Sequence, residues 1–286
     1  MAQNILPPNS LATGIGALPH TDPDAACDAV LSIFPRFPYV PTLPARGPLE
    51  GIVLMDSAQL PGRVLQEGRI SVDTTLDHSE EMEKVFQDFI EGNYADYPTA
   101  PEYNSGFHAM IKKDLSQMEV LKCQVTGPVT FGMQVVDSEK RPLFYDSLWA
   151  DLLGKLIALR ARWYEAEMKQ KTGVRQTLVI LNEPYLAALG SSVVPIDSGA
   201  VESAFADAAS LLTVGLGVHC CSNTDWGFLM SLSPSMISFD AYTTAREFLL
   251  YADALAAYLE GGGVVAWGIV PAEFELFRKE TEDSLF

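Results

Sequence analysis

A histidine and two cysteines stand together in the segment Val218-His219-Cys220-Cys221, which ends an apolar run. If that run is a β-strand, residues two apart point to the same side, so His219 and Cys221 share one face and Cys220 takes the other. An imidazole and a thiolate are ligands that zinc prefers. Two ligands do not complete a zinc site, so the segment predicts one half of a site that needs further ligands.

Other apolar runs also end in polar residues. Thr126-Gly127-Pro128 follows the run 120–125, Asn182-Glu183-Pro184 follows 177–181, and Asp240 follows 236–239. Side chains at the carboxyl ends of barrel strands are typical of active sites, so Glu183 and Asp240 are candidate catalytic acids and Thr126 is a candidate lining residue. Asp240 is also a candidate third metal ligand. A buried histidine or cysteine is often a packing residue, so core packing and zinc binding stay equal alternatives for His219 and Cys221.

Strands and helices alternate along the whole chain. Seven short apolar runs are predicted as strands, at 13–18, 39–43, 120–125, 177–181, 214–218, 236–239 and 264–269. The later runs are continuously apolar, which indicates a parallel sheet covered by helices. The chain is therefore predicted as an α/β protein with a (β/α)8 TIM-like barrel that lacks its last βα unit. A doubly wound sheet is the alternative, but unusual residues after nearly every strand favour the barrel.

The predicted domain organisation is one barrel domain over residues 1–286, with residues 61–116 as an insertion. Within that insertion, Arg69–Leu76 alternates like a hairpin strand and Ser79–Ile90 has helical spacing. The segment 244–260 is predicted as one helix. Glu50 and Asp56 fall in a predicted loop, where solvated side chains are the simplest expectation.

Composition restricts the classes of partner. The net charge of −18 argues against general nucleic-acid or anionic-membrane binding. No apolar run approaches the roughly 20 residues of a membrane span, and Met1–Ser10 shows no signal peptide. These features and four cysteines, expected to be reduced, predict a cytoplasmic protein.

Five motifs in chain order resemble the catalytic, C-terminal barrel of cobalamin-independent methionine synthase. Thr13-Gly14-Ile15-Gly16-Ala17-Leu18-Pro19 is similar to its T-x-I-G-S-x-P, Thr126–Thr130 to its T-G-P-V-T, Asn182–Leu186 to its D-E-P-A-L, His219-Cys220-Cys221 to its H-x-C zinc element, and Ile237–Asp240 to the strand with its zinc-binding glutamate. The same barrel superfamily includes uroporphyrinogen decarboxylase and the corrinoid-dependent methyltransferases.

The resemblance implies zinc-dependent methylation of a small thiol. It implies that His219 and Cys221 bind Zn²⁺, with Asp240 as a shorter stand-in for the glutamate. It further implies that the Gly16 and Ala17 amides bind the substrate carboxylate, and that Glu50 and Asn182 lie near its amino group. A corrinoid protein or a small methylated compound is the implied methyl donor.

The sequence also departs from that family. No cysteine follows Cys221, Asn182 stands where the family has aspartate, and Ala17 stands where it has serine. The long folate-binding half is absent as well, so a methyltransferase-like protein is expected and not a complete methionine synthase.

Two alternatives to a methyltransferase remain open. One is a metal-free lyase of the uroporphyrinogen decarboxylase type, which needs a basic mouth for which Arg46 and Arg63 are the nearby arginines. The other is a non-catalytic binding subunit with an incomplete site. An unclosed barrel would also expose strand edges, which predicts a homo-oligomer.

Overall fold

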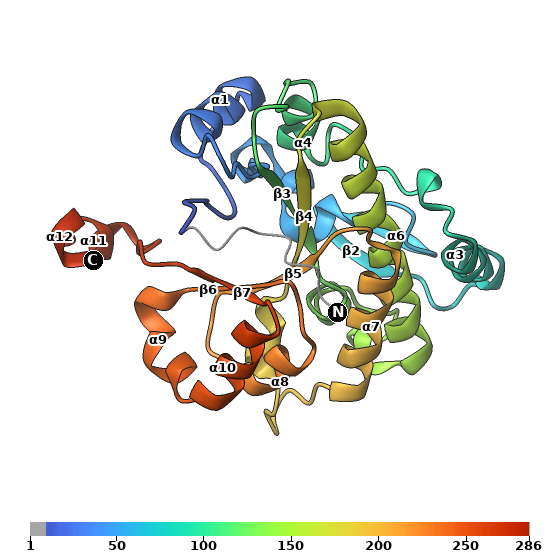
Figure 1. Ribbon diagram of the computed structural model, residues 1–286. Coiled ribbons are helices and arrows are strands. Elements are labelled where there is room, and N and C mark those ends of the chain that lie inside the picture. Colours follow the sequence, from blue (N-terminus) through green and yellow to red (C-terminus); the bar gives the residue numbers. More distant parts are fainter. Residues whose placement is uncertain (1–9, 286) are drawn as a thin grey trace.

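A parallel five-stranded sheet forms the centre of the protein in the computed structural model, which describes residues 10–285 (Figure 1). Its strands are β3 (Val120–Thr126), β4 (Gln176–Asn182), β5 (Leu216–Cys220), β6 (Met236–Phe239) and β7 (Val264–Trp267), and they lie side by side in that order. An α/β fold is therefore confirmed. A doubly wound sheet reverses its strand order at a switch point, and β3 to β7 show no such reversal.

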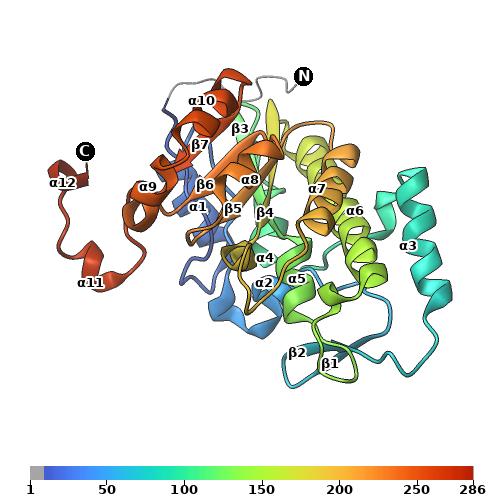
Figure 2. The same cartoon turned by 90° about the horizontal axis from the view of Figure 1, so that it is seen from below.

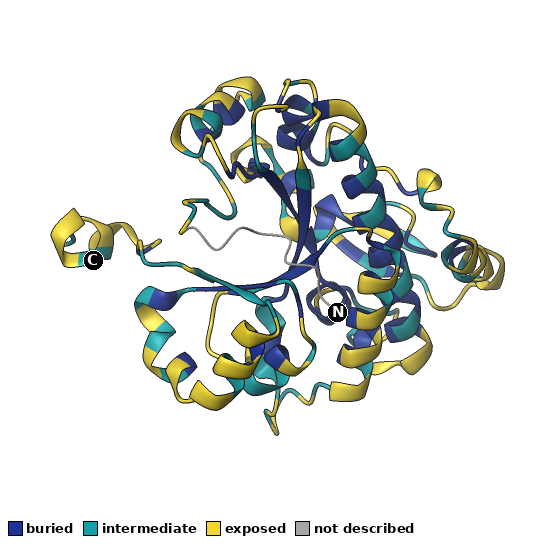
Figure 3. Cartoon of the chain, viewed as in Figure 1, coloured by how far each residue is buried: buried dark blue, intermediate teal, exposed yellow. Residues whose placement is uncertain are grey.

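Helices cover the outer face of this sheet (Figure 2). They include α6 (Ser147–Thr172), α7 (Ser198–Leu211), α8 (Trp226–Ser231), α9 (Ala241–Leu249) and α10 (Ala252–Glu260). Strands β3 to β6 are largely buried and β7 is only partly buried, whereas the outward sides of the helices are exposed (Figure 3). Every second strand residue, such as Val179, Val218 and Ile237, packs into the largest apolar cluster. The remaining strand residues face inward. Leu178, Ile180 and Met236 form a smaller apolar cluster there, and the inward residues at the carboxyl ends of the strands are left to form a site.

The longest helix, α6, has clear signals at both ends. The Asp146 side chain accepts hydrogen bonds from the amides of Leu148 and Trp149, which would otherwise lack partners at the helix start. The helix ends at Gly173, whose φ of 69° is the left-handed conformation that glycine adopts most easily. The predicted helix 244–260 is instead two helices, because the chain leaves helical geometry at Tyr251, between α9 and α10.

The first two predicted strands, 13–18 and 39–43, are not strands in the structure. They contribute only single bridges, Ala17 to Thr42 and Tyr39 to Lys122, which continue the sheet beyond β3. Prolines at 38, 41 and 44 supply no amide hydrogen, so a regular ladder cannot extend through this segment.

The other edge of the sheet is open. In residues 10–285 no strand pairs with the free side of β7, and the Trp267 side chain is 45% exposed. The chain then leaves the body of the protein and forms α11 (Phe274–Phe277) and α12 (Glu282–Leu285), which stand apart from the rest (Figure 1). The predicted TIM-like barrel without its last βα unit is not confirmed by the described part of the chain and stays a prediction.

The segment 61–116 contains the predicted hairpin and helices. Strands β1 (Arg63–Gln66) and β2 (Arg69–Val72) pair antiparallel around Glu67-Gly68, both with positive φ, as a tight hairpin turn requires. Helices α3 (Ser79–Glu91) and α4 (Ser105–Met110) follow. The division of the chain into one domain with an insertion stays a prediction.

The remaining regular elements are short. They are the α-helices α1 (Pro23–Ile33), α2 (Ile52–Met55) and α5 (Pro128–Gln134), and the 3-10 helices Pro44–Arg46, Pro48–Glu50, Tyr94–Asp96, Leu143–Tyr145 and Pro184–Ala188. Between residues 10 and 285 no helix is both long and apolar enough to cross a membrane. The stretch Met1–Ser10, in which no signal peptide was found, lies outside the described residues up to residue 9.

Candidate functional site

A row of inward-facing residues crosses the carboxyl ends of the strands. Strand pairing places Thr126 beside Asn182, Asn182 beside His219, His219 beside Ser238, and Ser238 beside Ala266. Residues paired in neighbouring parallel strands point to the same face. Four of these five residues are polar although they lie in a buried sheet, so the row is the candidate site.

His219 is oriented by its neighbour in the row. Its Nδ1 lies 3.0 Å from Ser238 Oγ, in a hydrogen bond that fixes the ring. Burial, together with the nearby positive charge of Lys122, lowers the pKa of His219 to about 4. The imidazole is therefore neutral at physiological pH, the form that can bind a metal.

The strand alternation predicted for the cysteines agrees with their exposure. Cys221 follows β5 and is exposed, whereas Cys220 is buried on the opposite face and its Sγ lies 3.3 Å from the Ser222 carbonyl oxygen. Asp240 also lies at a strand end, but its carboxylate caps α9 by accepting hydrogen bonds from the Thr243 amide and hydroxyl. Its oxygens are thus already bound within their own helix turn.

The predicted zinc site is incomplete within the described chain. No three His, Cys, Asp or Glu side chains of residues 10–285 come together as a metal-binding group. The donor atoms of His219 and Cys221 suit zinc in kind, but the structure brings no third protein ligand to them. We therefore derive no catalytic step through a metal.

Gln124 connects two of the predicted substrate-binding residues. Its Oε1 accepts a hydrogen bond of 3.0 Å from the Gly16 amide, and its Nε2 donates one of 3.2 Å to Asn182 Oδ1. The Gly16 amide, which the family resemblance assigns to a substrate carboxylate, is thus already bonded to a protein side chain. Ala17 is exposed and lies in the bridge to Thr42.

Glu50 is buried, so the expectation of a solvated loop side chain was wrong. Only 3% of it is exposed, because the 3-10 helix Pro48–Glu50 turns the side chain into the protein. Its Oε1 accepts hydrogen bonds from Arg46, at 2.8 Å, and from the Ser105 hydroxyl. Its Oε2 is buried without a partner among the described residues.

Asp56 is also buried and holds the start of the site. Its Oδ2 accepts a hydrogen bond of 2.7 Å from the Thr126 amide, while the Thr126 hydroxyl donates to the Ile52 carbonyl. Burial raises the pKa of Asp56 to about 6, against the opposing charge of Arg160. Because Thr126 is bonded on both its amide and its hydroxyl, it connects β3 to the loop that contains Asp56.

Glu183 lies behind the row and caps a helix. Its two carboxylate oxygens accept hydrogen bonds of 3.0 and 2.7 Å from the amides of Val129 and Thr130, in the first turn of α5. Burial raises the pKa of Glu183 to about 7. An added Cβ on Gly127 would lie 2.1 Å from Glu183 Oε1, which explains a glycine at that position. The geometry shows a positioning contact, and a catalytic role for Glu183 stays a prediction.

Sequence reasoning missed Lys122. This side chain is buried on the inner face of β3, where its Nζ donates a hydrogen bond of 2.6 Å to the Gly14 carbonyl and lies 5.6 Å from the centre of the Phe37 ring. Burial lowers its pKa to about 7. A lysine inside a predicted strand of the central sheet was the signal available in the sequence.

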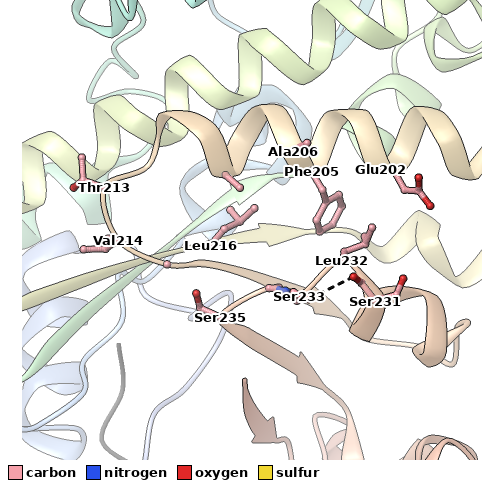
Figure 4. Close-up of a pocket in the computed structure, with 13 residues that line it drawn as sticks. Glu202, Phe205, Ala206, Thr213, Val214, Leu216, Ser231, Leu232, Ser233 and Ser235 are labelled. Atoms are coloured by element: carbon pink, nitrogen blue, oxygen red, sulfur yellow. Dashed lines mark hydrogen bonds between the residues drawn. The ribbon is translucent and has the colours of Figure 1, made fainter. Parts of the chain in front are cut away.

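A cavity of about 1010 Å³ lies at the other end of the strands (Figure 4). It is lined by Leu216, which begins β5, by Ser235, which precedes β6, and by Phe205 of α7. Glu202 is its one carboxylate among the described residues. The cavity therefore does not contain the predicted site residues, which lie at the carboxyl ends.

Comparisons with known proteins leave the family open. No family model matches the chain, and no curated protein matches it. Among solved structures, a B12-independent methionine synthase from Shewanella sp. W3-18-1, in complex with selenomethionine, is similar at 13% sequence identity and a TM-score of 0.34, over 77% of this chain and 70% of that chain. A TM-score of 0.34 is too low to transfer the fold or the activity.

Proposed function

We propose that the protein is a methyltransferase-like protein that binds a small thiol at the carboxyl ends of β3 to β6. The observation that carries the proposal is the His219 ring, held neutral by burial and oriented by Ser238, in the same row as Asn182. The exposed Cys221 thiol follows two residues later. The order of the five sequence motifs supports the same reading.

Zinc is the proposed partner of His219 and Cys221. Bound there, it would lower the pKa of a substrate thiol and favour the thiolate. A substrate sulfur would itself add a ligand to the two that the chain supplies. The proposed methyl donor is a corrinoid protein or a small methylated compound.

Metal analysis tests the zinc proposal. Purified protein is expected to contain stoichiometric zinc, which is lost in His219→Ala and in Cys221→Ser. Cys220→Ser is the matched control, because Cys220 is adjacent in sequence but buried on the opposite face. Equal zinc content in all four proteins would end the proposal.

A methyl-transfer assay tests the reaction itself. Protein, a small thiol and methylcobalamin are incubated, and the methyl thioether is measured by mass spectrometry. Product is expected with the unaltered protein and is expected to fall to background in His219→Ala. The same product rate without protein would contradict a methyltransferase.

A non-catalytic binding subunit is the second candidate, favoured by one observation. Asp240, the proposed third ligand, is bonded to Thr243 instead of facing a metal. This candidate predicts thiol binding without methyl transfer in the same assay.

The lyase alternative lacks the basic mouth that it needs. Arg46 binds Glu50 and the Thr21 carbonyl, and Arg63 binds the Tyr103 hydroxyl. Both arginines are thus engaged with the protein, and the lyase is not proposed.

A further inference from the structure

The hydrogen-bond chain through Gln124 fixes which way the Asn182 amide points. A backbone amide can only donate, so the atom of Gln124 that faces Gly16 is its oxygen. The other end of Gln124 is then its NH₂ group, which must face an acceptor, and that acceptor is Asn182 Oδ1. The Asn182 oxygen is therefore used, and its NH₂ group is the part left for a ligand.

Asn182 is only 9% exposed, but its NH₂ group is not fully buried. The NH₂ group has no hydrogen-bond partner among the described residues. It is also absent from the fully buried atoms without a partner in residues 10–285, so part of its surface is exposed. Asn182 lies directly beside His219 in the row. A ligand at His219 would thus meet hydrogen-bond donors at Asn182.

Lys122 adds a buried amine to the same inner face. Gly14 gives it a carbonyl oxygen, and no ion pair joins it to a carboxylate in the part of the chain that the structure describes. Lys122 in β3 and His219 in β5 both lie on the inner face of the sheet, on either side of β4. A buried amine without a counter-ion is costly, and a ligand carboxylate would supply that counter-ion.

Acceptors for a ligand ammonium are few by comparison. Asp240 is bonded to Thr243, and the Asn182 oxygen is bonded to Gln124. Glu50 keeps one free oxygen, but Arg46 already balances its charge. The site as built favours an anionic group over a cationic one.

We infer that the substrate is a small thiol with a carboxylate and no ammonium group, whose carboxylate binds the Asn182 NH₂ group on the inner face that also contains the Lys122 amine. The thiol part of this inference rests on the proposed function. The carboxylate part rests on Asn182, Gln124 and Lys122 alone, so the two can fail separately.

Matched small ligands test the inference by calorimetry. 3-Mercaptopropionate and cysteamine are similar in size and both carry a thiol, but one has a carboxylate and the other an ammonium group. We expect 3-mercaptopropionate to bind at least tenfold more tightly. Equal affinity, or tighter binding of cysteamine, would overturn the inference.

Two substitutions that nearly conserve side-chain size, at Asn182 and Gln124, separate the role of the amide NH₂ donors from general effects on folding. Asn182→Asp replaces the NH₂ group by a charged acceptor and is expected to abolish the tenfold preference. Gln124→Glu removes the donor that holds Asn182 Oδ1, lets the amide turn, and is expected to weaken the preference even where Asn182→Asp does not fold. Lys122→Met is expected to weaken carboxylate binding, and Lys112→Met, on the surface, is the control. An unchanged preference in folded Gln124→Glu and Lys122→Met would contradict the inference.

Ligands without sulfur separate the inference from the proposed function. Butyrate is expected to compete with 3-mercaptopropionate, whereas propylamine is not. If butyrate competes and no methyl transfer occurs, the carboxylate site stands and the methyltransferase fails. If methyl transfer occurs equally on cysteamine and 3-mercaptopropionate, the carboxylate inference fails and the methyltransferase stands.

Discussion

The carboxylate of Asp56 accepts a hydrogen bond of 2.7 Å from the backbone amide of Thr126. Both residues are fully buried, and the bond joins the loop after α2 to the end of β3. The loop thereby contributes to the mouth of the site although it belongs to no strand. A buried acid at this junction makes the stability of the protein depend on pH.

We expect the stability conferred by Asp56 to fall as pH rises. Burial raises its pKa from 3.8 to about 6, so the folded state binds the proton more tightly than the unfolded state. That contribution is fully present below the unfolded pKa and is lost as pH rises through about 6. Between pH 4 and pH 7 the loss is on the order of 2 kcal/mol. Urea unfolding across this range measures it.

Asp56→Asn is the control for this effect. The variant keeps an oxygen that accepts from Thr126 but cannot titrate, so its free energy of unfolding should vary less with pH. Glu183 also has a raised pKa and changes stability in the same direction, but it is present in both proteins. Identical pH dependence of the two proteins would contradict the assignment to Asp56.

Gly127→Ala is expected to destabilise the protein by about 1–3 kcal/mol. The added methyl group collides with the Glu183 carboxylate, which cannot move without leaving the amides of α5. The cost should be smaller in a Glu183→Ala background, and a double-mutant cycle measures the coupling. Gly199→Ala, with room for a methyl group at the start of α7, should change stability by less than about 0.5 kcal/mol. Additive effects of Gly127→Ala and Glu183→Ala would exclude the contact.

The central strands could be predicted from sequence because their signal is local. Short runs rich in apolar residues predicted all of β6 and β7 and most of β3, β4 and β5, and the order of the strands follows from their alternation with helices. The segments 13–18 and 39–43 were wrongly predicted as strands. Their apolar composition is typical of strands, but the prolines around 39–43 lack the amide hydrogens that a regular ladder needs. Local sequence patterns could not determine whether the sheet closes into a barrel, because closure depends on contacts between residues distant in sequence.

The sequence predicted which residues lie at the strand ends of the candidate site, but not the hydrogen bonds that those residues make. His219 and Asn182 lie in one row, as residues at the ends of parallel strands should. The capping contacts of Asp240 and Glu183 depend on where α9 and α5 begin, which the sequence did not resolve. Gln124 was missed because its role lies in joining Gly16 to Asn182, and those residues are far apart in sequence.

Cys221 should be the cysteine that reacts fastest in the folded protein. It is exposed, whereas Cys27, Cys123 and Cys220 are buried. After zinc has been removed with a chelator, brief treatment with iodoacetamide followed by peptide mass spectrometry should show modification at Cys221 and little elsewhere. Added zinc should slow this reaction, and His219→Ala should remove the protection. Zinc protection that is unchanged in His219→Ala would contradict a shared metal site.

The open edge at β7 should promote self-association, and the exposed aromatic residues after it should contribute. Phe274 is 67% exposed and Phe277 is 53% exposed, on the segment that leaves the protein beside the unpaired edge. Unpaired strand edges and exposed apolar side chains both favour contact with another chain. Because the net charge of −18 opposes that contact, added salt should increase it by screening the repulsion.

Sedimentation velocity at several protein and salt concentrations measures this association. Replacing both Phe274 and Phe277 by serine should weaken it, while stability should change by less than about 0.5 kcal/mol because both side chains are already largely in water. Val193→Ser is the control, since Val193 is 86% exposed but lies in the loop before α7. If the control weakens association as much as the double variant, general surface hydrophobicity and not the β7 edge is responsible. A monomer at every salt concentration would contradict the prediction. It would show that the open edge of β7 is too short, or too strongly repelled, to pair with a second chain.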